Sequence, residues 1–191
     1  GGDGIDYLLG PGTDSTWRIT GDNLGTLNGQ VSFVGVEHLA GAANNEDTFV
    51  FDAASSLTGN VLGGDSGFDS IVLTGGTFST IHYTATSADS GSIRRDDDVI
   101  SYAGMEPITD NNVAADRVFT GTSGADTIEL IDDPASGMMT ITAVGTAESH
   151  TFPNPTNSLT INAGGGRDTV TIKSFDSGFG AALNINGESG I

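Results

Sequence analysis

Aspartates that follow glycine-rich turns are the side chains in this sequence whose type and spacing best suit chemistry. They are Asp6, Asp47, Asp69, Asp126 and Asp168. Each follows a turn rich in glycine or asparagine and precedes a short run of alternating apolar residues. A carboxylate in such a place can bind a cation, or it can accept hydrogen bonds from the N–H groups of its own turn. The sequence therefore leaves two uses open, metal binding and turn capping.

The turn and its flanks form a unit that recurs along the chain. Its clearest copy is INAGGGRDTVTI, residues 161–172. The two arms alternate with the period of two expected of strands that bury one face. Between them, glycines form an elbow that only glycine makes without steric cost. Related copies begin at Gly1, Asn44, Gly63 and Gly121, and a truncated copy, NGESGI, ends at Ile191.

The spacing of the copies predicts stacked coils. The shortest step, Asp47 to Asp69, is about 22 residues, which is the length of one solenoid coil. A longer period of about 120 residues maps Asp6 onto Asp126 and Asp47 onto Asp168. We therefore expect two super-repeats, residues 1–106 and 107–191, in a chain that is a piece of a longer array.

The fold class that this pattern predicts is all-β. Short β-branched and aromatic runs are separated by Gly, Asn, Asp and Ser, and no run has the apolar period of a helix. Short strands alone would also suit a sandwich. The recurring elbow favours a parallel β-solenoid of roughly eight to ten coils, with residues 87–98 as one charged loop excursion. The exit arms would form one apolar ladder of Leu8, Phe49, Ile71, Ile128 and Val170.

Composition narrows the classes of partner. The chain carries 25 acidic and six basic residues, a formal net charge of −19, which disfavours binding to nucleic acid or anionic membranes. It has no cysteine, which excludes disulfides and thiol catalysis. No apolar run approaches the roughly 18 residues of a membrane span, so no membrane insertion is expected.

The first copy, GGDGIDYLL, resembles the calcium-binding nonapeptide of secreted repeat-in-toxin proteins. The resemblance implies Ca²⁺ as a cofactor, bound by Asp6, Asp69, Asp126 and Asp168, with Asp3 and Asp65 nearby. The nonapeptides of that family follow one another without a gap, whereas here single copies stand about 22 or more residues apart. Capping of the turn by the aspartate therefore stays open beside calcium binding.

The phrase VEHLAGAANNEDTFVF, followed by GGDSGFDSIVL, is similar to the repeats of giant secreted or surface-attached bacterial proteins of the adhesin and haemagglutinin type. This resemblance implies a structural role, as a stalk, fibre or adhesin, rather than catalysis. It also implies an extracellular or cell-surface location, with neighbouring copies of the chain, flanking repeats or surface glycans as partners.

Three weaker candidates complete the list. Arg94 to Asp98 is the densest charge cluster and would suit a polysaccharide-active enzyme, or simply a solvated loop. His38, His82 and His150 lie far apart in sequence and are expected to be ordinary strand residues. Trp17 is expected in the core, with a sugar-stacking platform as the alternative.

Overall fold

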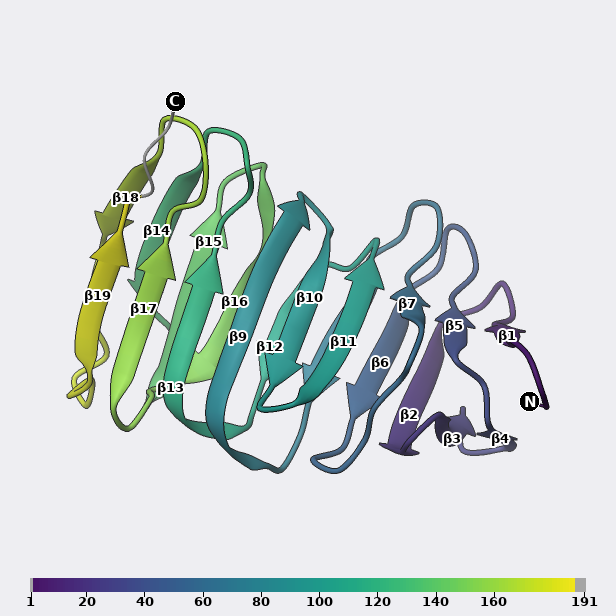
Figure 1. The fold of residues 1–191 in the computed structure, drawn as a ribbon. Helices are drawn as coiled ribbons and strands as arrows, with labels where there is room; N and C mark the ends of the chain where they lie inside the picture. The colour runs from purple at the N-terminus through teal and green to yellow at the C-terminus, as the bar shows by residue number, and fades with distance from the viewer. Residues whose placement is uncertain (1, 188–191) are drawn as a thin grey trace.

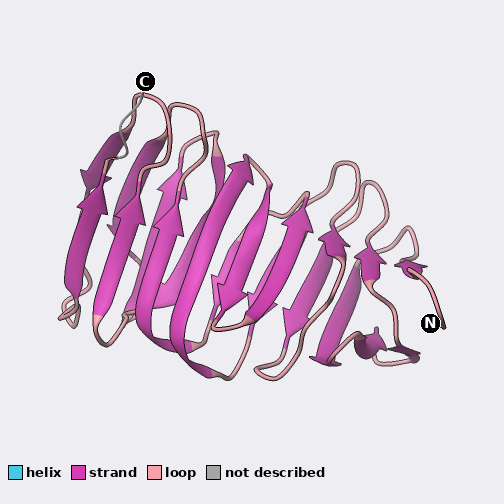
Figure 2. Cartoon of the chain, in the orientation of Figure 1, coloured by secondary structure: helices cyan, strands magenta, loops and turns pink. Residues whose placement is uncertain are grey.

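Two β-sheets make up residues 2–187, the part of the chain that this computed structural model describes, and no helix occurs there (Figures 1 and 2). The nine-stranded first sheet has the order β1 (Tyr7–Leu9), β5 (His38–Ala40), β7 (Asn60–Leu62), β11 (Asp98–Ala103), β10 (Ser90–Arg95), β9 (Thr77–Ser87), β13 (Val113–Thr120), β17 (Ser158–Asn162) and β19 (Ala182–Asn186). The ten-stranded second sheet has the order β18 (Thr169–Ile172), β14 (Thr127–Asp132), β15 (Met138–Ala143), β16 (Ala147–Pro153), β12 (Ile108–Asp110), β8 (Ser70–Leu73), β6 (Asp47–Phe51), β2 (Ser15–Gly21), β3 (Leu24–Leu27) and β4 (Val31–Val34).

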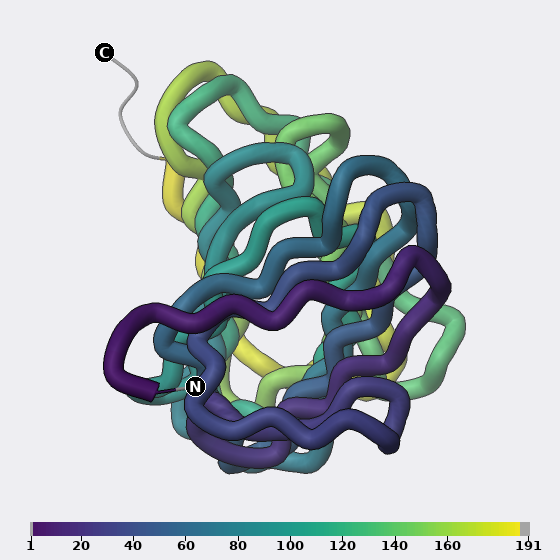
Figure 3. Tube along the Cα trace, turned by 90° about the vertical axis from the view of Figure 1, so that its right-hand side faces the viewer, coloured from purple at the N-terminus to yellow at the C-terminus, as the bar shows by residue number. Residues whose placement is uncertain are grey.

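The chain passes back and forth between the two sheets. From β5 to β8, each strand lies in the sheet opposite to the strand before it. Strands of successive passes pair in parallel, β5 with β7 and β6 with β8. Figure 3 shows the passes as rounded loops that lie one behind another around a common interior. The elbows therefore join strands of opposite sheets.

Both sheets are mixed, so the parallel β-solenoid is not confirmed, although the all-β class is. Antiparallel meanders interrupt the parallel pairs: β2–β3–β4 and β14–β15–β16 in the second sheet, and β9–β10–β11 in the first. Within the described residues, the chain enters the second sheet at β2, β6, β8, β12, β14 and β18. That is fewer passes than the eight to ten coils expected, because the meanders use chain length without adding a pass.

Apolar residues of the second sheet form much of the predicted ladder. Register aligns Trp17 with Phe49 and then Phe49 with Ile71, and all three are fully buried. Farther along the sheet, Ile128 lies opposite Val170. The placement of Leu8 in this ladder was wrong. Leu8 lies in β1 of the first sheet opposite Leu39, because β1 comes before the elbow that leads into β2.

The expected loop at residues 87–98 is also wrong, because most of it is strand β10 and its hairpin turn into β11. The segment is polar, yet Gly91, Ile93 and Arg95 alternate toward the interior. Arg95 is 0% exposed, and its guanidinium donates to the carbonyl oxygens of Asp52 and Ser55. The strand could not be recognised from the sequence, because a charged residue, Arg95, occupies one of its inward positions.

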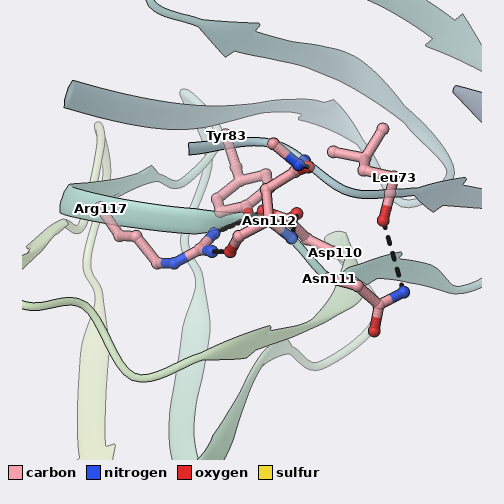
Figure 4. A network of polar contacts seen from close by, with 7 residues as sticks. Leu73, Tyr83, Asp110, Asn111, Asn112 and Arg117 are labelled. Carbon is pink, nitrogen blue, oxygen red and sulfur yellow. Dashed lines mark hydrogen bonds and ion pairs between the residues drawn. The ribbon is translucent and has the colours of Figure 1, made fainter. Parts of the chain in front are cut away.

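A buried polar network crosses the interior beside β13 (Figure 4). Arg117 forms an ion pair with Asp110 at 2.5 Å and donates a second hydrogen bond to the carbonyl oxygen of Asn112. Tyr83 donates its hydroxyl proton to the Asp110 carboxylate and accepts a bond from Arg117. Burial raises the pKa of the Tyr83 hydroxyl well above its ordinary value. The network is enclosed on all sides, so its role is structural.

The two ends of the stack expose apolar side chains. At one end, Tyr7 and Leu9 of β1 are 60% and 72% exposed. At the other end, Ile185 of β19 is 47% exposed and Phe175 is 45% exposed. The first residue of the first elbow copy, and residues 188–191 of the NGESGI copy, lie outside the described residues. A search of the described residues finds no helix able to span a membrane.

Candidate functional site: the elbow aspartates and an acidic groove

The elbow aspartates stack in two pairs. The Oδ1 atom of Asp69 accepts a hydrogen bond from the backbone N–H of Asp47 at 2.7 Å. The Oδ1 atom of Asp168 accepts the equivalent bond from Asp126 at 2.9 Å. In both pairs, the carboxylate of one pass holds the backbone of the pass before it at the same position of the elbow. The stacking of these elbows, which the sequence predicted, is therefore present.

Glycines let the elbows come this close. A Cβ atom added to Gly41 would lie 2.1 Å from the carbonyl oxygen of Gly63. One added to Gly63 would lie 1.9 Å from the carbonyl oxygen of Gly104. Real Cβ atoms do not approach carbonyl oxygens so closely, so close packing between passes requires glycine at these two positions.

The second oxygen of each aspartate serves its own turn where the geometry allows. Asp126 Oδ2 accepts the backbone N–H of Thr122 at 2.7 Å, and Asp47 Oδ2 accepts that of Ala42 at 3.3 Å. Burial raises the pKa of the Asp47 and Asp69 carboxyls above their ordinary values. Turn capping, one of the two uses left open by the sequence, is thus observed directly.

Asp6 does not occupy the position that the 120-residue period assigned to it. It precedes β1 in the first sheet, and its N–H donates to the Glu37 carboxylate at 2.8 Å. Asp126 immediately precedes β14 in the second sheet. The equivalent position in the pass that contains β2 is Ser15, the first residue of β2, which lies opposite Asp47. Serine therefore stands here where the other elbows have aspartate. Because the aspartate is missing, this copy of the elbow was not found from the sequence.

The remaining predicted calcium ligands, Asp3 and Asp65, lie outside the two stacked pairs. Asp3 and Asp65 are both exposed. Among residues 2–187, no three His, Asp or Glu side chains form a group that could hold a metal ion. Calcium takes six to eight oxygens, and each elbow pair brings two carboxylates, of which two oxygens in each pair are already bonded to an N–H. The two elbow pairs therefore offer calcium few free side-chain oxygens, and calcium binding there stays a prediction.

A groove on the outer face of the first sheet brings acidic residues together beside the elbows. We call it the acidic groove. Its floor is Ala40, Leu62 and Ala103, which lie in register on β5, β7 and β11. Its two connected hollows, of about 510 and 120 Å³, share Gly64, Asp89 and Gly104. Its carboxylates are those of Asp65, Asp69, Asp89 and Glu106.

A further carboxylate, that of Glu148, lies near the carboxylates of the acidic groove. Glu148 of β16 is half-buried, and its pKa is raised to about 7 by burial, by Glu106 and by Asp89. The Asp89 carboxylate is oriented by the hydroxyls of Ser87 and Ser90, which donate to Oδ1 at 3.1 and 2.7 Å. Sequence reasoning missed Asp89, Glu106 and Glu148, because they come from separate turns and share no local motif.

The charge cluster at Arg94 to Asp98 borders a separate hollow of about 380 Å³ with His82. Both Asp96 carboxylate oxygens accept backbone N–H groups of strand β9, from Ser79 and Thr80. Arg94 lies 3.6 Å from Asp97 and also donates to the backbone of Asp96. Burial, with the nearby Arg94 charge, lowers the pKa of His82. The charges here hold a hairpin turn together.

The three histidines lie in strands, as expected. His38 is in β5 and stacks on Tyr7, and His82 is in β9. His150 of β16 is fully enclosed, with neither ring nitrogen hydrogen-bonded, and its ring lies 4.6 Å from that of Tyr83. Burial lowers its pKa to about 3, so the ring is neutral. Trp17 is fully buried in the core, as predicted.

Comparison of the chain with known proteins finds no matching family model, no similar curated protein and no similar solved structure.

Proposed function

We propose that this chain is a structural segment of a long extracellular β-solenoid that serves as a bacterial stalk, fibre or adhesive surface. The observation that carries the proposal is the parallel, in-register pairing of strands from successive passes, such as β13 with β17 and β17 with β19. Because each pass contacts only the passes next to it, a stack of this kind can be lengthened by further passes of the same structure. The antiparallel meanders are then insertions within single passes.

An internal repetition of topology supports the proposal. The order β1, meander β2–β4, β5, β6, β7 returns as β13, meander β14–β16, β17, β18, β19. In both series the meander lies in the second sheet and directly follows the first strand. The two super-repeats expected from the sequence, residues 1–106 and 107–191, would each contain one copy of this series, and β8 to β12 would lie between the copies.

The open ends favour association with neighbouring copies or flanking repeats. β1 and β19 are the edge strands of the first sheet, and an edge strand offers unpaired N–H and C=O groups to another strand. Ala182 donates its N–H to Asn157, and Asn186 accepts from Ala163. Because alternate residues of a parallel pair face the same neighbour, the N–H of Ile185 points away from β17.

Replacing Ile185 tests the proposed association. Ile185→Pro removes the outward N–H at an edge, where proline is tolerated, and is expected to abolish concentration-dependent assembly in sedimentation velocity. Ile185→Val keeps the N–H and should assemble as the unsubstituted chain does. A chain that stays monomeric at every concentration, or a proline variant that assembles normally, would contradict end-to-end association.

Calcium binding at the elbows stays a prediction, drawn from the resemblance of GGDGIDYLL. A chelator titration followed by circular dichroism decides it. Loss of strand signal on chelation, restored by Ca²⁺, would favour a calcium-dependent module. An unchanged signal favours aspartates that act only as turn caps.

A further inference from the structure

The outer face of the first sheet carries a row of polar side chains that crosses every strand of the sheet (Figure 1). We call it the outer row. In sheet order its members are Tyr7, His38, Asn60, Ser101, Ser92, Thr84, Thr120, Asn162 and Asn186. On the strands between the two edges, each member is next to a buried core residue and so faces outward. The row contains no Asp, Glu, Lys or Arg, in a chain with a net charge of −19.

Hydrogen bonds hold side chains of the outer row in place. Asn162 Nδ2 donates to Thr120 Oγ1 at 3.2 Å, and Asn186 Nδ2 donates to Asn162 Oδ1 at 2.8 Å. The Nε2 atom of His82, which lies beside the row, shares a bond of 2.8 Å with Thr120 Oγ1. A primary amide has two N–H donors and each of these bonds uses one, so both asparagines keep a donor for a ligand. Side chains that are already fixed lose little conformational freedom on binding.

An aromatic pair forms one end of the outer row, and a hollow lies beside its middle. The rings of Tyr7 and His38 stack at 4.3 Å, and Tyr7 is 60% exposed. The hollow of about 380 Å³ is lined in part by His82, the partner of Thr120. An exposed aromatic ring offers an apolar face for packing, and a hollow of this size is within the range of small-molecule sites.

These features fit an extended, uncharged partner with many hydroxyl groups. A hydroxyl group is both donor and acceptor, so it can pair with the serine, threonine and asparagine side chains of the row alike. A nucleic acid or another polyanion would be repelled by the net charge of −19. A polycation would find no carboxylate in the row. An extended peptide is recognised at the edge of a sheet, where main-chain groups are free, whereas this row lies on a face.

We propose that the outer row binds a neutral β-1,4-linked polysaccharide, one chain of which lies across the strands. Such chains are extended and flat, and their advance per sugar is close to the spacing of about 4.7–4.9 Å between neighbouring strands. Successive sugars therefore meet successive side chains of the row. One sugar packs on the Tyr7 ring, and a sugar over Thr84 and Thr120 reaches His82 at the edge of the hollow. The proposal rests on the adhesive role proposed above and names its class of ligand, but it does not require end-to-end association.

Affinity electrophoresis in native gels that contain hydroxyethylcellulose tests the proposal. We expect this polymer to retard the unsubstituted chain. Binding should be at least about tenfold weaker to dextran, which is neutral but has flexible α-1,6 links, and to carboxymethylcellulose, which adds negative charge to the same backbone. Thr84→Val/Thr120→Val removes two hydroxyls and keeps the shape of both side chains, so it should weaken binding to hydroxyethylcellulose about tenfold. Tyr7→Ala, which removes the aromatic ring, should weaken it as well.

The matched control removes two hydroxyls from the outer face of the second sheet. Thr140 and Thr151 lie in register there, on β15 and β16, and are hydrogen-bonded at 2.8 Å. Thr140→Val/Thr151→Val should bind as the unsubstituted chain does, and circular dichroism checks that both double variants keep their strand content. If the Thr84→Val/Thr120→Val variant loses strand signal, Tyr7→Ala decides the proposal, because the Tyr7 ring is largely exposed.

Three results would overturn the proposal: no retardation by hydroxyethylcellulose, equal retardation by dextran, or equal losses in both double variants. Retardation by the polymer reports binding by single chains, whereas sedimentation velocity reports assembly. Polysaccharide binding and end-to-end association can therefore fail independently of each other.

Discussion

At the scale of single residues, the interior depends on a few buried polar groups with fixed partners. Arg117 is fully enclosed, and its ion pair within residues 2–187 is with Asp110, while Tyr83 accepts a further hydrogen bond from it. Isolated charges are very costly in an apolar interior, so the loss of either partner would leave the other buried without a counter-charge. The geometry makes the pair sensitive to the loss of either member.

Asp110→Ala leaves the Arg117 guanidinium without its counter-charge. We expect a loss of about 3–5 kcal/mol in the free energy of unfolding, measured by urea titration with circular dichroism. The triple variant Tyr83→Phe/Asp110→Leu/Arg117→Met removes the whole network and should cost less than the single change. A single variant as stable as the unsubstituted chain would show that Arg117 is not balanced in this way.

His150 predicts a dependence of stability on pH. Its folded-state pKa of about 3 lies below the ordinary 6.5, so its contribution is complete above pH 6.5 and is lost as the pH falls through about 3. His150→Leu should remove that acid-induced loss. Glu148, whose pKa is raised to about 7 from 4.5, acts in the opposite sense and gains stability as the pH falls from about 7 to 4.5.

Thermal unfolding of both variants across pH 3–8 separates the two groups. The His150→Leu curve should lie above that of the unsubstituted chain mainly at the acid end. The control, Glu148→Gln, should differ mainly near neutral pH. A His150→Leu curve parallel to the unsubstituted one at every pH would refute the assignment to His150.

At the scale of elements, the elbow is a packing unit as well as a turn. Gly63→Ala would drive a methyl group into the Gly104 carbonyl, and we expect it to destabilise the fold by about 1–3 kcal/mol. Gly12→Ala, with open space around its added Cβ, is the matched control and should be near neutral. Urea unfolding compares the two. Equal effects would mean that the elbows do not touch as described.

Alternation of apolar and polar residues predicted the strands in which apolar residues occupy the inward positions. The elbow glycines and the pairs Phe49–Ile71 and Ile128–Val170 could be found because alternation and spacing agree there. Strand β10 could not, because its inward positions include Arg95, whose burial is made possible by distant carbonyl groups of Asp52 and Ser55. Burial of this kind depends on contacts with residues far away in the sequence, so the local sequence does not indicate it.

The candidate sites divide along the same line. Turn capping by Asp126 depends on residues four positions apart and was open to prediction. The acidic groove unites an elbow, the β9–β10 turn and the segment after β11, and only the fold shows that these meet. The misplacement of Asp6 arose because Ser15 replaces an expected aspartate, so the period was counted from the wrong elbow.

At the scale of the whole molecule, the large net negative charge lowers the stability of the folded chain. A formal charge of −19 on 191 residues repels itself, and salt screens that repulsion over a Debye length of about 10 Å at 0.1 M. We expect the melting temperature to rise as NaCl increases from about 10 to 300 mM. Differential scanning fluorimetry measures this, and sucrose at matched osmolality is the control. A melting temperature that falls with NaCl would contradict it.

The direction of the hydrogen bonds between passes has a mechanical consequence. In parallel strands these bonds lie across the strand axis, and so they run along the length of the stack from one pass to the next. Tension applied between the two ends therefore acts first on the hydrogen bonds between β19 and β17. These bonds break before those between the next pair of strands, β17 and β13. Pulled in this way, the molecule should lengthen in a series of small steps and act as a spring that absorbs work before it breaks.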